Sequence, residues 1–130
     1  MTIVKTEKQH KGEFLMSEAP GTLSREQGIL SSGENVVDGQ VLKWSGSELV
    51  AAVGTVNSAG ENTEDIAGIA YGAVNASSTG PNGAVDQPIV YIARLAEVKL
   101  VNLTLYTGSV TAGKTTAMKA DLLAKFIQVR

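Results

Sequence analysis

Short apolar runs alternate with glycine-marked polar turns over most of the chain, a pattern typical of a β-rich fold. Strands are predicted at residues 41–44, 49–53, 66–76, 89–94 and 101–106. The fourth run is apolar on both faces, so we expect it at the centre of a sheet. The fifth alternates, and Val101, Leu103 and Leu105 are predicted to face the core. A tight hairpin is expected at Asp38-Gly39.

One helix is predicted late in the chain, over about residues 111–126, with Thr111 as its N-cap. Met118, Leu122 and Phe126 are spaced four apart and form its predicted buried stripe, while a polar stripe follows Lys114, Asp121 and Lys125. Residues 126–130 then form a short final strand. The fold class that follows is a single mainly β domain with one C-terminal helix.

The N-terminal segment differs from the rest of the chain. Residues 1–13 are polar and show no sustained period, so we interpret them as a flexible arm. An apolar patch at residues 14–16 follows, and then a Pro20-Gly21 turn. The patch has two interpretations: a first strand that packs into the core, or an anchor that docks on a partner.

Composition excludes most catalytic chemistry. The 130 residues are enough for one domain and contain 14 glycines, no cysteine and one histidine. Disulfide scaffolds, thiolate metal sites and cysteine nucleophiles are therefore excluded, and we expect no enzyme activity, no cofactor and no bound metal. His10 lies in the predicted arm, where a solvated side chain is the more common outcome. Glu61, Glu64 and Asp65 lack the ligand pattern of a calcium loop.

Charge is small overall but unevenly distributed. The net charge is −2, so no general affinity for nucleic acid is expected. Residues 33–93 carry one basic and seven acidic groups, whereas residues 94–130 carry six basic and two acidic groups. Such polarity can favour head-to-tail contact between copies, although a mixed solvated surface is more common. The apolar runs are far shorter than the roughly 20 residues of a membrane helix, so we expect no membrane partner.

Residues 108–115 match the phosphate-binding pattern G-x-x-x-x-G-K-[ST] and precede the predicted helix. That fold needs a parallel sheet and a later acidic residue, whereas hairpins come before this segment and about fifteen residues follow it. A glycine turn with a helix start is the preferred interpretation. Trp44 and Tyr91 lie in strand segments, where packing in a core or an interface is preferred over a stacking platform.

Residues 14–26, FLMSEAPGTLSRE, resemble the opening signature of the lambda-type head decoration proteins of tailed bacteriophages. Three later blocks are similar to the family pattern: GQVL at 39–42, AGIAYGAVNA at 67–76 and VYIARLAEV at 90–98. The ending FIQVR at 126–130 matches as well, so the resemblance covers about residues 13–130 in order. Leu95 departs from the pattern, because relatives often carry an acidic residue after the arginine.

The resemblance implies a homotrimer with a β-clip-like fold, meaning an incomplete barrel of short strands. Such proteins bind the outside of the expanded phage capsid and stabilise it against internal DNA pressure. The implied partner is the major capsid protein, and the location is the virion after synthesis in the host cytoplasm. Residues 1–25 would be a flexible capsid-binding arm and residues 26–130 the decoration domain. Capsid contacts would fall on the apolar residues Phe14, Leu15, Met16 and Leu23.

Two other classes of function remain open at this stage. A virion-surface module could recognise glycan or protein through the loops at residues 57–65 and 77–87. A small nucleotide-binding protein could use residues 108–115. The virion-surface module is the preferred alternative function.

Overall fold

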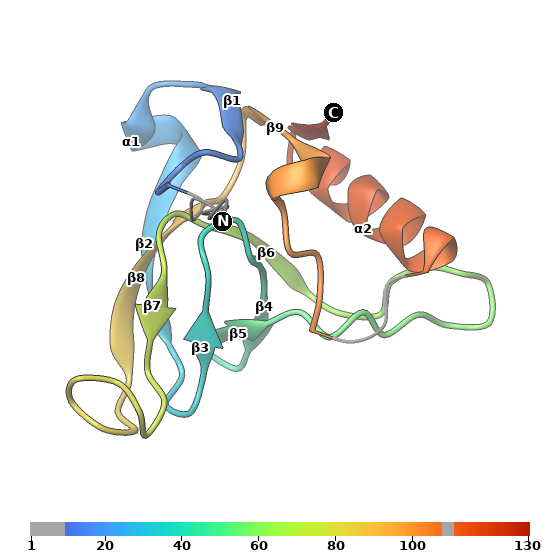
Figure 1. Ribbon diagram of the computed structural model, residues 1–130. Helices are drawn as coiled ribbons and strands as arrows, with labels where there is room; N and C mark the ends of the chain where they lie inside the picture. Colours follow the sequence, from blue (N-terminus) through green and yellow to red (C-terminus); the bar gives the residue numbers. More distant parts are fainter. Residues whose placement is uncertain (1–9, 108–110) are drawn as a thin grey trace, which may run out of the picture.

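The computed structural model describes residues 10–107 and 111–130 (Figure 1). The described elements are β1 (Leu15–Glu18), α1 (Gly21–Ser24), β2 (Arg25–Leu30), β3 (Asn35–Val36), β4 (Val41–Ser45), β5 (Glu48–Ala51), β6 (Ile66–Ala70), β7 (Val74–Asn75), β8 (Gln87–Ile92), β9 (Ala96–Val98), the 3₁₀ helix η1 (Leu100–Asn102), α2 (Ala112–Ala124) and β10 (Ile127–Val129). The predicted fold class, mainly β with one C-terminal helix, is confirmed.

Five strands form a ring in the order β2-β5-β4-β6-β8, with β8 pairing back to β2. The ring is unevenly bonded. β2 and β8 pair along six residues, whereas β2 and β5 meet at the single pair Leu30 and Leu49. One further hydrogen bond, from Ser31 N to the Leu49 carbonyl (2.9 Å), supports that seam. The thin seam makes this the incomplete barrel that the resemblance implies.

β6 separates two hydrophobic cores, and every one of its residues is buried. The barrel core comprises Leu30, Val36, Leu42, Leu49, Ala51, Ala67, Ala70, Ala76, Ile89, Tyr91 and Ala93. The helix-side core comprises Phe14, Val41, Ala52, Ile66, Ile69, Ile92, Ala96, Val98, Leu105, Tyr106, Met118, Leu122, Ile127 and Val129. Because side chains alternate along a strand, Ile69 and Ala70 of β6 enter opposite cores.

The helix-side core is closed by the two ends of the described chain. β9 lies between β1, which is antiparallel to it, and β10, which is parallel to it. α2 packs beside this sheet and buries Met118 and Leu122, as predicted (Figure 1). Among the described residues, no helix combines the length and apolar character needed to cross a membrane.

The prediction that Phe126 continues the buried stripe of the helix is wrong. α2 ends at Ala124, and Phe126 adopts a left-handed backbone with φ of +59°. Its side chain is 71% exposed, because the change of backbone hand turns it away from the face that carries Met118 and Leu122.

The prediction of a strand at residues 101–106 is also wrong. Residues 100–102 form η1, and Val101 is 90% exposed, although Leu105 is buried. Leu100 N donates to the Arg130 carbonyl (2.8 Å), and Leu103 N then donates to the Leu100 carbonyl (3.1 Å). The chain therefore turns at the end of β9, and of the predicted strand only Thr104 pairs, in an isolated bridge with Gln40.

The turn at Asp38-Gly39 does not form the predicted hairpin, since β3 pairs with β7 and not with β4. Asp38 instead accepts hydrogen bonds from Gly12 N (3.0 Å) and Gly72 N (2.7 Å). Its carboxylate joins the segment before β1 to the bend after β6. The alternation of apolar and polar residues marks the turn, but it does not show which strands pair across it.

Candidate functional site

The four residues predicted to contact a capsid occupy different environments. Phe14 is fully buried in the helix-side core, and Leu15 is half-buried. Met16 is 48% exposed and Leu23 is 53% exposed. Residues 1–9 of the predicted arm lie outside the described residues. From residue 10 to residue 25 the chain packs onto the domain, so the described part of the predicted arm is a piece of the fold.

The corner between β1 and α1 is held by the carboxylate of Glu18. Arg25 pairs with it through two guanidinium nitrogens, and Ser24 Oγ donates to Glu18 Oε2 (2.5 Å). The Arg25 hydrogen bond is the main reason that the pKa of Glu18 lies below its usual value. The Arg25 guanidinium also lies 4.0 Å from the centre of the Tyr71 ring. These contacts set the direction of the short α1 turn that presents Leu23.

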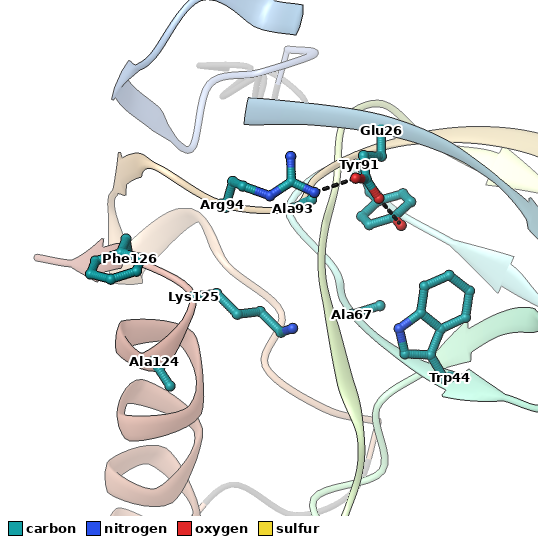
Figure 2. Close-up of a pocket in the computed structure, with 9 residues that line it drawn as sticks. All are labelled: Glu26, Trp44, Ala67, Tyr91, Ala93, Arg94, Ala124, Lys125 and Phe126. Carbon is teal, nitrogen blue, oxygen red and sulfur yellow. Dashed lines mark hydrogen bonds and ion pairs between the residues drawn. The ribbon is translucent and has the colours of Figure 1, made fainter. Parts of the chain in front are cut away.

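A cleft of about 310 Å³ opens between the barrel and the C-terminal end of α2, as Figure 2 shows. Its lining residues are Glu26, Trp44, Ala67, Tyr91, Ala93, Arg94, Ala124, Lys125 and Phe126. The lining combines the Trp44 and Tyr91 rings with the charged groups of Glu26, Arg94 and Lys125. This combination suits an aromatic side chain that carries charged groups beside it.

A polar network organises one wall of the cleft. Tyr91 donates its hydroxyl hydrogen to Glu26 Oε2 (3.0 Å), and Arg94 pairs with Glu26 Oε1 (Figure 2). The Arg94 hydrogen bond is the main cause of a lowered pKa at Glu26. Burial, reinforced by Glu26, raises the pKa of Tyr91 to about 12, so the hydroxyl stays a donor at neutral pH. Arg94 also donates to the Leu23 carbonyl (2.6 Å), which links the cleft to α1.

The aromatic residues in the cleft pack against each other. The Trp44 and Tyr91 rings meet edge to face, with centroids 6.2 Å apart and an interplanar angle of 86°. Tyr91 is buried in the barrel core and Trp44 packs against it. Lys125 extends its ammonium group over the cleft in Figure 2, and it forms no ion pair with any residue that the structure describes.

The glycine-rich pattern at residues 108–115 is only partly described, since residues 108–110 fall outside the structure's described ranges. The prediction of Thr111 as N-cap is confirmed, because its side chain accepts a hydrogen bond from Lys114 N (3.2 Å). Thr115 Oγ1 donates to the Thr111 carbonyl (3.0 Å), and Lys114 Nζ lies 5.5 Å from the centre of the Tyr106 ring. The described polar groups of the pattern thus support the start of the helix.

Glu64 has a structural role that the sequence patterns did not reveal. Its almost fully buried carboxylate accepts hydrogen bonds from the backbone amides of Val53 (2.8 Å), Gly54 (2.5 Å) and Thr55 (2.9 Å), and pairs with Lys43 (3.1 Å). Burial by itself raises the pKa of Glu64, but these partners more than offset it and leave the pKa below its usual value. The acidic loop at residues 57–65 is therefore held against the barrel at its Glu64 end.

The comparison with protein families gives one match over most of the chain. The family model described as bacteriophage lambda head decoration protein D matches residues 4–127. The comparison with curated proteins finds no match. The matched range includes the barrel core, the helix-side core except Val129, the β1 corner and the cleft.

Proposed function

We propose that this chain, which belongs to the family of the bacteriophage lambda head decoration protein D, binds the outside of the expanded phage capsid as a homotrimer and stabilises it against internal DNA pressure. The observation that carries the proposal is the family match over residues 4–127. The protein is accordingly a structural component of the virion, and its partner is the major capsid protein. Its work is mechanical, so it needs no cofactor.

The contact with the capsid falls on the N-terminal region, residues 1–25. Met16 and Leu23 are exposed and available to a partner, whereas Phe14 is buried in the helix-side core. β1 is also the edge strand of its sheet among the described residues. An edge strand has backbone groups that can pair with a strand of another chain, and side chains such as Met16 set the register.

Phe14 gives this region its mechanical connection to the domain. Its ring lies in the helix-side core, and Lys99 N donates to its carbonyl (2.7 Å). A load on the arm is therefore transmitted to β9 and the core. A single arm offers only a small contact area and binds weakly. Three arms on one trimer raise the apparent affinity by roughly two to four orders of magnitude.

Binding to purified expanded shells, measured by co-sedimentation, tests the proposal. We expect the Met16→Ser, Leu23→Ser double variant to bind about tenfold or more weakly, because each change removes apolar area from the contact. Removal of residues 1–9 should weaken binding further while leaving the described fold intact. Val101→Ser is the matched control, since Val101 is 90% exposed and lies outside the arm.

Circular dichroism of each variant verifies folding. Full binding by the double variant and by the shortened chain would rule out the arm as the contact. Equal binding of the unchanged protein to expanded and unexpanded shells would contradict the proposed preference for the expanded capsid.

A further inference from the structure

Leu95 comes directly before β9 and Phe126 directly before β10, and both adopt a left-handed backbone. Leu95 and Phe126 have φ of +56° and +59°, and they are 39% and 71% exposed. Ala96 N donates to the Phe126 carbonyl (3.2 Å), so the two segments are in direct contact. Glycine is the usual residue after a helix C-cap, because a Cβ disfavours this conformation. We call Leu95 and Phe126 the ridge.

The ridge lies between two grooves. On one side is the cleft, whose lining includes Arg94, Lys125 and the single carboxylate Glu26. On the other side is a groove of about 330 Å³ that also touches Phe126 and includes the carboxylates Glu18 and Glu97, which pair with Arg25 and Arg130 of the same chain. We call the second one the acidic groove. Phe126 lines both the cleft and the acidic groove.

The cleft can accept a side chain of the kind that the ridge presents. A cavity of about 150 Å³ is enough to hold a benzene molecule, and the cleft is about twice that size. Trp44 and Tyr91 offer ring edges and faces to an incoming aromatic side chain. Lys125 adds a second requirement: the occupant should carry a carboxylate beside its apolar group, because the Lys125 ammonium group has no ion pair among the described residues.

The chain itself meets both requirements. Phe126 is the exposed aromatic side chain, and Glu18 and Glu97 are the carboxylates beside it. A second copy can therefore place Phe126 in the cleft while its acidic groove lies toward Lys125. The contact joins two different surfaces, and such a contact can close into a ring.

We propose that the ridge is the contact between copies of this chain, with Phe126 of one copy in the cleft of the next. The inference rests on the proposed function only for the number of copies in the ring, which is three. The exposure of Phe126 and the strain in its backbone are explained together, because the side chain is held outward for its neighbour. In the free chain the Phe126 side chain is exposed and its backbone is strained, and assembly removes the exposure.

Phe126→Gly tests the ridge, with the self-association of the full chain measured by sedimentation equilibrium over a wide range of concentration. We expect the dissociation constant to rise about 100-fold, since a central aromatic anchor is lost. The melting temperature of the dissociated chain should stay the same or rise, because glycine adopts φ near +59° without strain. A merely structural role for the ring would instead lower that melting temperature.

Two controls locate the contact. Val101→Ser removes an apolar side chain elsewhere that is more exposed than Phe126, and it should leave the dissociation constant unchanged. Ile29→Ser changes an exposed residue of β2, away from the ridge, and should also be neutral. Dissociation caused by Ile29→Ser, with none caused by Phe126→Gly, would overturn the inference.

A mixing experiment tests the head-to-tail geometry. Ala124 is exposed on α2 and lines the cleft, so Ala124→Arg obstructs the cleft without disturbing a core. Each variant alone should be monomeric. Mixed in equal amounts, Phe126→Gly supplies an open cleft and Ala124→Arg supplies a ridge, so a one-to-one heterodimer should form, but no ring. A mixture that stays monomeric, or an Ala124→Arg variant that assembles normally, would contradict the geometry.

The outcome is separable from that of the proposed function. If the unchanged chain decorates expanded shells but stays monomeric in solution at every concentration, this inference fails and the proposed function stands. If the chain assembles through Phe126 but never binds shells, the reverse holds.

Discussion

The barrel core and the helix-side core lie on the two sides of β6 and are built in opposite ways. Five of the eleven barrel-core residues are alanines, at positions 51, 67, 70, 76 and 93. The helix-side core is filled mainly by large side chains and includes Phe14, Tyr106 and Met118. The barrel core thus depends on the close approach of backbones, whereas the helix-side core depends on side chains delivered from distant parts of the chain.

The strongest test of this difference is Gly68→Ala in β6. A Cβ at this position would lie 2.1 Å from the Ile92 carbonyl oxygen, so β6 and β8 would have to separate. They share only two residue pairs, and we expect the variant to lose more than about 4 kcal/mol of the free energy of unfolding. Urea unfolding at neutral pH measures this loss.

Gly113→Ala is the matched control for that substitution. Nothing lies within 4 Å of a Cβ at this position in α2, so the change should stabilise the protein by about 0.5–1 kcal/mol. If Gly68→Ala proved as harmless as Gly113→Ala, close backbone approach would not be what holds the barrel.

Phe14→Ala tests the helix-side core. We expect a loss of about 3–4 kcal/mol, because a fully buried ring leaves a cavity. The damage should be regional, since Phe14 joins β1 to the core next to β9 and α2. Hydrogen exchange should therefore show reduced protection in β1, β9 and β10, with β4 and β5 little changed. A uniform loss of protection would mean that the two cores unfold as one unit.

Glu64→Gln tests the hydrogen bonds and the ion pair by which Glu64 joins the loop before β6 to the barrel. We expect a loss of about 1–3 kcal/mol at pH 7, because a buried carboxylate with charge-assisted hydrogen bonds becomes neutral. The pKa of Glu64 is lowered in the folded protein, so its contribution is present above the unfolded value near 4.5 and is lost as the pH falls through the folded value.

The difference between Glu64→Gln and the unchanged protein should accordingly shrink as the pH falls below 4.5. Urea unfolding of both proteins across this range measures it. A difference that does not depend on pH would assign the effect to shape and not to charge. Glu48→Gln, at a carboxyl group of β5 that takes no part in the Glu64 hydrogen bonds, is the control.

Local patterns explain which parts of the fold were predictable. The hairpin of β4 and β5, the central strand β8 and the capped start of α2 depend on residues close together in the chain, and all were predicted within a few positions. Phe126 was missed because the helical period says nothing about the residue where the backbone changes hand. Glu64 was missed because its partners Val53, Gly54 and Thr55 are about ten residues away and are backbone groups.

The sequence by itself determined the mainly β fold with one late helix, the positions of most turns and the family. These follow from spacing and residue type, which act over a few neighbours. Only the tertiary structure decided that Phe14 is buried while Met16 and Leu23 are exposed, and that Phe126 forms a ridge between two grooves. Exposure depends on which distant segments arrive at the same place, and that is a property of the assembled fold.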